Sequence, residues 1–220
     1  MSDGYTTLAD EILSVLVESH FDKDNKEFVP AKSLDHITTR DTIDEELSRA
    51  VTDDDAIRHT LEFQSLVTYI HERATTLFLI AISVGFEHSV LYDVMRLFKA
   101  HDWCDSDNLP IKPLVPKEKH ELSAFGAPWN VAWRIRQFYN GQWTFLAPVF
   151  KPATQARSTR DFKRAHILPF TKKHNVFDQG SFGKVYKYTI HQDHLVDPEN
   201  PVSTLCLRSN PPTGCLECIC

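Results

Sequence analysis

The feature that most constrains this fold is a proline-free stretch from about Asp55 to Val84. Apolar side chains recur through its first half at spacings of three and four residues, which align them on one face of a helix. This apolar stripe consists of Ile57, Leu61, Phe63, Leu66, Val67 and Ile70. Gly85 ends the pattern. The sequence therefore predicts one long helix that presents a broad apolar face.

Shorter helical patterns lie on both sides of this stretch. They cover residues 6–20, 30–38, 41–50, 88–101 and 129–140. Thr6 or Thr7 is a suitable N-cap for the first of them, because a threonine hydroxyl can accept a bond from an amide of the first turn. The Asn-Gly pair at 140–141 then predicts a turn. Together these patterns predict a helical domain over residues 1–140.

The composition changes after this region. Residues 141–165 contain an aromatic, β-prone segment and then a polar, basic one, which together favour a linker. Residues 166–195 contain three short β-prone runs, and residues 196–220 contain several prolines and few large apolar groups. We therefore expect strands in the former and a disordered tail in the latter. The predicted fold class is mainly α, with a helical N-terminal domain and a small antiparallel β appendage.

The charges are unevenly distributed along the chain. Residues 1–60 hold 15 acidic and 6 basic side chains, whereas residues 151–190 hold 9 basic and 2 acidic ones. A basic stretch can meet a polyanion, but an ordinary solvated loop explains it as well, and we expect no nucleic-acid partner. The first residues lack the basic and apolar regions of a secretory signal, and the longest apolar run is ten residues, from Leu77 to Phe86. These features favour a cytoplasmic protein without membrane contact.

Cysteine and histidine residues near the C-terminal end raise the question of a metal site. Four thiols could enclose zinc or remain free, or the C-terminal Cys-x-Cys could carry a lipid, and the spacing is not that of two matched C-x-x-C pairs. They are Cys206, Cys215, Cys218 and Cys220. We expect free thiols in a reducing compartment. His191 and His194 have no further ligand at suitable spacing, so we expect a solvent-facing turn and no metal.

The segment that carries chemistry is Gly-Ser-Phe-Gly-Lys-Val over residues 180–185. Two glycines between β-prone runs can form a hairpin that lies flat over phosphate groups, because a side chain at those positions would hold the backbone amides away. The candidate nucleotide-binding residues are Gly180, Ser181, Phe182, Gly183 and Val185, the last of which would pack on the base. A simple β-hairpin with a glycine turn is the other interpretation.

This segment resembles the G-x-G-x-x-G-x-V loop of protein kinases, with Asp178 in place of the first glycine. Over roughly residues 60–195 the chain is similar to serine/threonine kinase-like proteins of filamentous fungi, which carry a helical region ahead of the kinase domain. The matching pieces are residues 142–150, 166–170, the glycine segment and 189–194. The resemblance implies a kinase N-lobe that begins near His166, ATP as cofactor, and phosphoryl transfer to a hydroxyl.

The departures from the kinase pattern determine the functional expectation. Kinases need a lysine on the third strand, an H-R-D catalytic loop and a D-F-G aspartate. The sequence has neither motif; Lys187 comes too early, and Arg208 stands near the position of the lysine. We therefore expect a truncated protein kinase-like chain that is inactive, with no catalytic residues and with weak or absent ATP binding. The alternative is a non-enzymatic helical module whose acidic first third and apolar stripe dock a protein partner.

Overall fold

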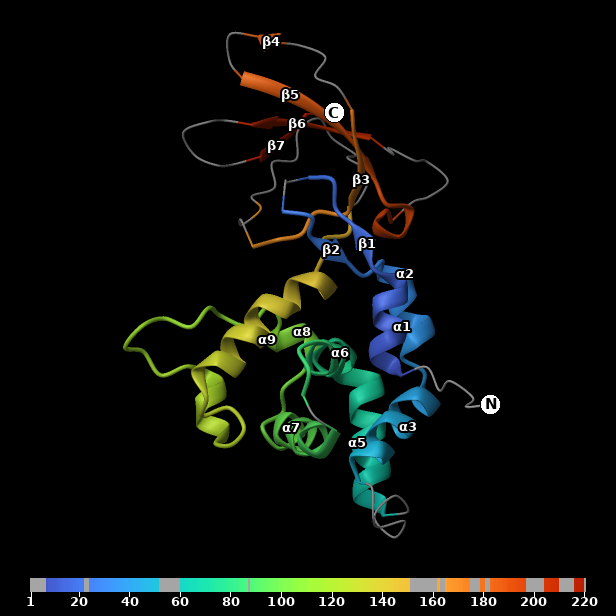
Figure 1. Ribbon diagram of the computed structural model, residues 1–220, viewed down its shortest axis with the longest axis vertical. Coiled ribbons are helices and arrows are strands. Elements are labelled where there is room, and N and C mark those ends of the chain that lie inside the picture. Colours follow the sequence, from blue (N-terminus) through green and yellow to red (C-terminus); the bar gives the residue numbers. More distant parts are fainter. Residues whose placement is uncertain are drawn as a thin grey trace. The chain divides into compact units, whose positions relative to one another are not determined.

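A computed structural model describes residues 7–21, 24–51, 60–86, 88–150, 162, 165–174, 179–180, 183–196, 204–209 and 216–219. The chain forms two compact units, each made of two segments of the sequence (Figure 1). The helical unit consists of residues 1–14 and 34–142, and the sheet unit consists of residues 15–33 and 143–220. The chain is mainly helical with an antiparallel β part, which confirms the predicted fold class.

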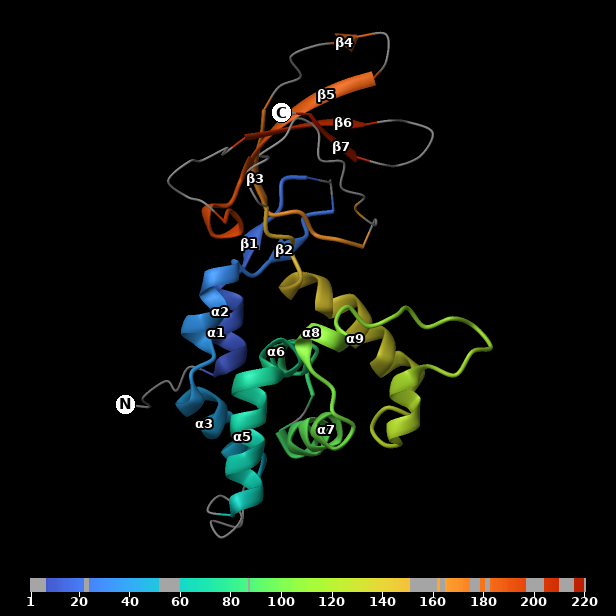
Figure 2. The same cartoon turned by 180° about the vertical axis from the view of Figure 1, so that it is seen from behind.

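Helices are the commonest regular structure among the described residues. In chain order they are α1 (Leu8–Val15), α2 (Ala31–Ile37), α3 (Arg40–Ala50), α5 (Leu61–Arg73), α6 (Thr75–Ser83), α7 (His88–Ala100), α8 (Asp105–Asn108) and α9 (Ala132–Phe145). Within the helical unit, α3 lies beside α5 in both views (Figures 1 and 2). Thr7 caps α1: its hydroxyl accepts from the Asp10 amide at 3.1 Å, and its own amide donates to the Asp10 carboxylate. This selects Thr7 from the two predicted caps.

The predicted long helix over residues 55–84 is wrong, because α5 ends at Arg73 and α6 begins at Thr75. Residues 52–59 lie outside the described residues. At the break, the Thr75 hydroxyl donates to the carbonyls of Ile70 at 3.0 Å and His71 at 3.1 Å. A threonine side chain that bonds to preceding carbonyls favours a change of helix direction. The new direction lets α6 bury every residue from Leu77 to Ile82.

The start of α6 is satisfied by a carboxylate from elsewhere in the helical unit. Asp105 Oδ2 accepts from the Thr76 amide at 2.7 Å, and Oδ1 accepts from the Leu77 amide at 3.0 Å. First-turn amides of a helix have no partner within it, so an acidic group at this end is stabilising. Burial is the main influence on Asp105 and raises the pKa of its carboxyl.

The predicted turn at Asn140-Gly141 is also wrong, because α9 continues through it to Phe145. Gly141 is needed for close packing: a Cβ atom there would lie 2.6 Å from Cγ1 of Val84, at the end of α6. The next residue, Gln142, is fully buried and binds the backbone of Ile111 twice. Its side chain accepts from the Ile111 amide at 2.7 Å and donates to the Ile111 carbonyl at 3.2 Å. These contacts explain why a turn-forming dipeptide remains helical.

The apolar stripe of the sequence forms part of the core. Phe63, Leu66, Val67 and Ile70 are all buried, whereas Leu61 is 89% exposed at the start of α5. An aromatic cluster completes this core, with neighbouring ring centroids 5.2 to 6.0 Å apart. It consists of Phe98, Trp103, Trp129 and Phe138.

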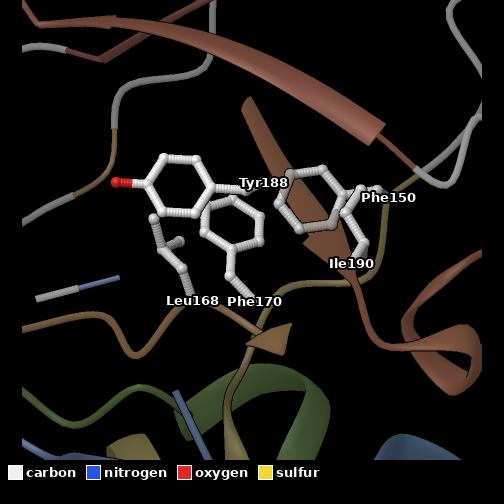
Figure 3. Close-up of a cluster of buried hydrophobic side chains, with 5 residues drawn as sticks. All are labelled: Phe150, Leu168, Phe170, Tyr188 and Ile190. Atoms are coloured by element: carbon white, nitrogen blue, oxygen red, sulfur yellow. The ribbon is translucent and has the colours of Figure 1, made fainter. Parts of the chain in front are cut away.

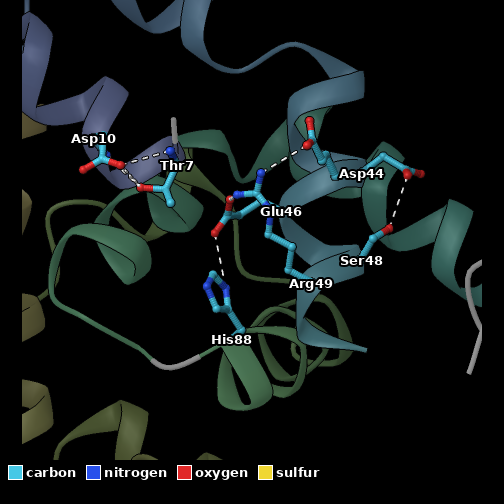
Figure 4. A network of polar contacts seen from close by, with 8 residues as sticks. Thr7, Asp10, Asp44, Glu46, Ser48, Arg49 and His88 are labelled. Carbon is cyan, nitrogen blue, oxygen red and sulfur yellow. Dashed lines mark hydrogen bonds and ion pairs between the residues drawn. The ribbon is translucent and has the colours of Figure 1, made fainter. Parts of the chain in front are cut away.

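A buried carboxylate links two helices of the same unit (Figure 4). Glu46 of α3 pairs with Nη1 of Arg49 at 2.8 Å and with Nδ1 of His88, the first residue of α7, at 3.3 Å. Buried carboxylates require such partners, since an unpaired charge in the interior is strongly unfavourable. The partners are themselves partly exposed, which limits the desolvation of the network.

The sheet unit is built on an antiparallel sheet whose strands follow one another in the order β3-β5-β6-β7, with β4 pairing to β5. These strands are β3 (Phe170–His174), β4 (Gln179–Gly180), β5 (Gly183–Ile190), β6 (Thr204–Ser209) and β7 (Leu216–Ile219). A two-stranded pair, β1 (Val17–Glu18) and β2 (Glu27–Phe28), belongs to the same unit. Two of these strands correct the expected disorder of residues 196–220, of which 204–209 and 216–219 form strands: β6 pairs with β5 and β7 with β6, so the backbone groups on these shared edges are hydrogen-bonded.

The core of the sheet unit explains a second difference from the predicted domains. Five buried side chains form it: Phe150, Leu168, Phe170, Tyr188 and Ile190 (Figure 3). Phe21 packs on two of these rings, with its centroid 5.7 Å from Phe170 and 5.6 Å from Tyr188. Residues 15–33 therefore join the sheet unit although they were expected in the helical domain. The expected linker also differs, because residues 141–145 are helical and Phe150 is core.

Candidate functional site

The glycine segment forms a tight antiparallel hairpin between β4 and β5. Gly180 pairs with Gly183, and Gln179 pairs with Lys184. The sequence leaves two residues, Ser181 and Phe182, to connect the paired glycines, and both lie outside the described residues. Two-residue connections are the commonest hairpin loops, and glycine at their margins lets another backbone or a ligand approach closely.

The next strand places a basic residue in register with this hairpin. Along the β5–β6 pair, Val185 is opposite Arg208 and Lys187 is opposite Cys206. Three of the five candidate residues thus have defined backbone positions: Gly180 and Gly183 pair with each other, and Val185 is opposite Arg208 of β6. Asp178, which replaces a kinase glycine, lies outside the described residues.

A lysine of the sheet that the sequence did not single out lies over two aromatic rings. Nζ of Lys173 in β3 lies 4.3 Å from the ring centroid of Tyr186 and 5.6 Å from that of Tyr188. An ammonium over an aromatic face is attracted by the ring quadrupole. Burial, and secondarily the neighbouring Tyr186, raise the pKa of Tyr188 to about 12. The lysines of β3 and the tyrosines of β5 were visible in the sequence, but the register of the two strands was not.

The two histidines after β5 correct a prediction. His194 is only 1% exposed, and His191 is partly buried, so this turn is not solvent-facing. Both ring nitrogens of His194 contact backbone groups, those of Pro148 and Ala31. In the part of the chain that the structure describes, no group of three metal-ligating side chains occurs. The ring of His194 is therefore used in bonds that hold the fold together. To bind a metal ion, it would have to lose one of these backbone partners.

The cysteines are distributed over β6, β7 and undescribed segments. Cys206 is opposite Ile219 and Cys218 is opposite Leu207 in the backbone register of the β6–β7 pair. Cys215 and Cys220 lie outside the described residues. Cys104 is buried and free in the helical unit.

The helical unit contains a groove between α5 and α7 with a volume of about 560 Å³. Leu66, Leu97, Ala100 and Ala127 provide its apolar part. Charged side chains provide the rest: Glu62 pairs with Arg96 at 2.9 Å, Arg96 lies 4.0 Å from Asp93, and Lys99 donates to Ser65. Grooves of this size are within the range of small-ligand sites. The apolar stripe itself is unsuited to docking, because most of it is core.

No protein-family model, curated protein or solved structure matches this chain. Among the described helices, none combines the length and the apolar character needed to cross a membrane.

Proposed function

We propose that the sheet unit is a protein kinase-like nucleotide fold in which the β4–β5 hairpin is the phosphate-facing element, and that these 220 residues do not catalyse phosphoryl transfer. The observation that carries the proposal is the pairing of Gly180 with Gly183 beside a third antiparallel strand. A strand, a glycine hairpin, a second strand and a basic residue on the third strand are the arrangement that kinases use to cover ATP phosphates.

The same arrangement argues against catalysis. Arg208 is opposite Val185 in register, and in the proposed fold it stands about where kinases require a lysine; a planar guanidinium does not replace a compact ammonium. The sequence contains no H-R-D or D-F-G motif to supply a base or a metal ligand. Phosphoryl transfer depends on positioning and electrostatics, so without these groups the hairpin can only contact nucleotide weakly. A cytoplasmic location, where ATP is abundant, is part of this proposal.

Titration with Mg-ATP tests the proposal. Calorimetry should show binding no tighter than the high-micromolar range, and amide shifts in NMR spectra should begin at Gly180 and Gly183. Replacing Gly183 with Val should remove those shifts, because a side chain would hold the backbone away from phosphate. The matched control is Thr171→Val, which places the same side chain in β3 of the same sheet, away from the hairpin. A low-micromolar dissociation constant, or measurable phosphate transfer, would contradict the proposal.

A second candidate function is a non-enzymatic interaction module, favoured by the groove between α5 and α7. The apolar probe 1-anilinonaphthalene-8-sulfonate should bind there and increase in fluorescence. Ala100→Trp should fill the groove and abolish the signal, whereas Ala132→Trp, on an exposed position of α9, should not. If the apolar probe binds the groove and Mg-ATP shifts no hairpin amide, this candidate replaces the first.

A further inference from the structure

The turn that follows β5 contains a buried histidine with two backbone partners. His194 ends the short helix η2 (Gln192–His194) and is 1% exposed. Its Nδ1 lies 3.2 Å from the carbonyl of Pro148, and its Nε2 lies 3.2 Å from the amide nitrogen of Ala31. A carbonyl only accepts and an amide only donates, so the ring is neutral, with its proton on Nδ1.

These two bonds join separate segments of the sheet unit. Ala31 is the first residue of α2 and follows β2, whose Phe28 is fully buried. The Phe28 ring meets the His194 ring edge-on, with centroids 5.2 Å apart. The backbone of His194 is fixed as well, because its carbonyl accepts from the Phe150 amide at 2.7 Å. The ring thus holds the β2–α2 junction against the turn after β5.

Among the described residues, the charged and titratable groups around the ring are His191, Asp193 and Lys32. The ring centroid of His191 lies 6.1 Å from that of His194, and Asp193 precedes His194 in η2. From α2, Lys32 reaches the Asp193 carboxylate at 3.7 Å, which offsets part of the negative charge.

Burial is the main influence on the His194 ring and lowers its pKa, and His191 acts in the same direction. The carbonyls of Pro148 and Val29, together with Asp193, oppose this shift without reversing it. The folded protein therefore favours the neutral ring more than an unfolded chain would.

We propose that His194 is an acid-sensitive clasp that holds the β2–α2 junction to the sheet while neutral and releases it when protonated. A protonated ring carries a hydrogen on both nitrogens, so Nε2 can no longer accept from the Ala31 amide. It can turn toward the Val29 carbonyl instead, which leaves the Ala31 amide without its partner.

The other end of the same segment has a different anchor. The His20 amide donates to the carbonyl of Phe170 at 2.7 Å, and the Ser19 hydroxyl donates to that of Leu168 at 2.6 Å. Neither bond uses a titratable side chain. Acid should therefore free residues near Ala31 and leave the attachment near His20 in place.

Hydrogen exchange of single amides, measured by NMR and normalised to unstructured rates, tests the clasp. Between about pH 7 and about pH 4.5, which spans histidine titration, the protection of the Ala31 amide should fall on the order of tenfold. The protection of the His20 amide should change by less than about twofold over this interval, because its bond does not titrate. Equal changes at both amides would overturn the proposal.

A matched pair of variants isolates the ring. In His194→Gln the side-chain oxygen can still accept from Ala31 but cannot titrate, so the protection of Ala31 should become independent of pH. In His191→Gln the pH response should persist. If the His194→Gln variant retains the response, the clasp is not His194. In the unaltered chain the His194 ring resonances must titrate together with Ala31 release, and separate midpoints would refute the proposal even if a variant fails to fold.

Discussion

Replacing Gly141 with alanine should destabilise the helical unit, against the usual rule for helix interiors. Alanine in place of glycine normally stabilises a helix by about 1 kcal/mol, because it reduces the freedom of the unfolded chain. In α9, however, the added Cβ would lie 2.6 Å from Val84 Cγ1. Apolar carbons prefer separations of about 3.5 to 4.0 Å, so the two groups would overlap by about 1 Å.

The size of the destabilisation depends on whether the Val84 side chain can move away from the added methyl group. Val84 is β-branched and has one stiff torsion, so it cannot withdraw as a long side chain could. Overpacking of this kind costs about 1–3 kcal/mol. After subtraction of the helix-propensity gain of about 1 kcal/mol, Gly141→Ala should lower the free energy of unfolding by up to about 2 kcal/mol. Urea titration followed by far-UV circular dichroism measures this difference.

A double-mutant cycle identifies the cause. In a Val84→Ala background the overlap is absent, so Gly141→Ala should stabilise by up to about 1 kcal/mol. The exposed Gln137 in the same helix calibrates propensity, since Gln137→Gly and Gln137→Ala differ only in that contribution. If Gly141→Ala is stabilising in the unaltered chain, or if Val84→Ala leaves its effect unchanged, the close-packing argument is refuted.

Three further changes test other contacts. Asp105→Ala should lower the free energy of unfolding by about 1–3 kcal/mol, because two first-turn amides of α6 lose their acceptor. Urea titration measures this change, and a smaller one would contradict the prediction. His88→Ala should lower the free energy of unfolding by less than about 1 kcal/mol, since His88 is half-exposed. Glu46→Ala should lower it more, because it removes the acceptor shared by His88 and Arg49. Equal changes in the same assay would argue against the network. Burial raises the pKa of Tyr188 to about 12, so stability from its neutral phenol is complete below about pH 10 and is lost as the pH rises toward 12. Tyr188→Phe should accordingly lose less stability than the unaltered chain between about pH 9 and about pH 11, and parallel pH profiles would contradict this.

Local patterns were enough to predict most helices and the strand that contains the glycine segment. The spacing of apolar residues identified α7, and Thr7 was recognisable as a cap because capping depends on bonds three residues apart. The glycine pair likewise marked the hairpin, since Gly180 and Gly183 are close in sequence as well as in space. Each of these features is determined by neighbours along the chain.

Contacts between distant residues decided the rest. Gly141 is packed closely against Val84, a contact that the sequence does not show. Residues 15–33 belong to the sheet unit because the rings of Phe21 and Phe28 pack against aromatic side chains of that unit. The histidine pair was read as exposed because a turn sequence gives no sign of what covers it. Burial of His194 depends on Ala31 and Pro148, more than 40 residues away in the sequence. Packing of this kind is a property of the assembled unit, and only the tertiary structure contains it.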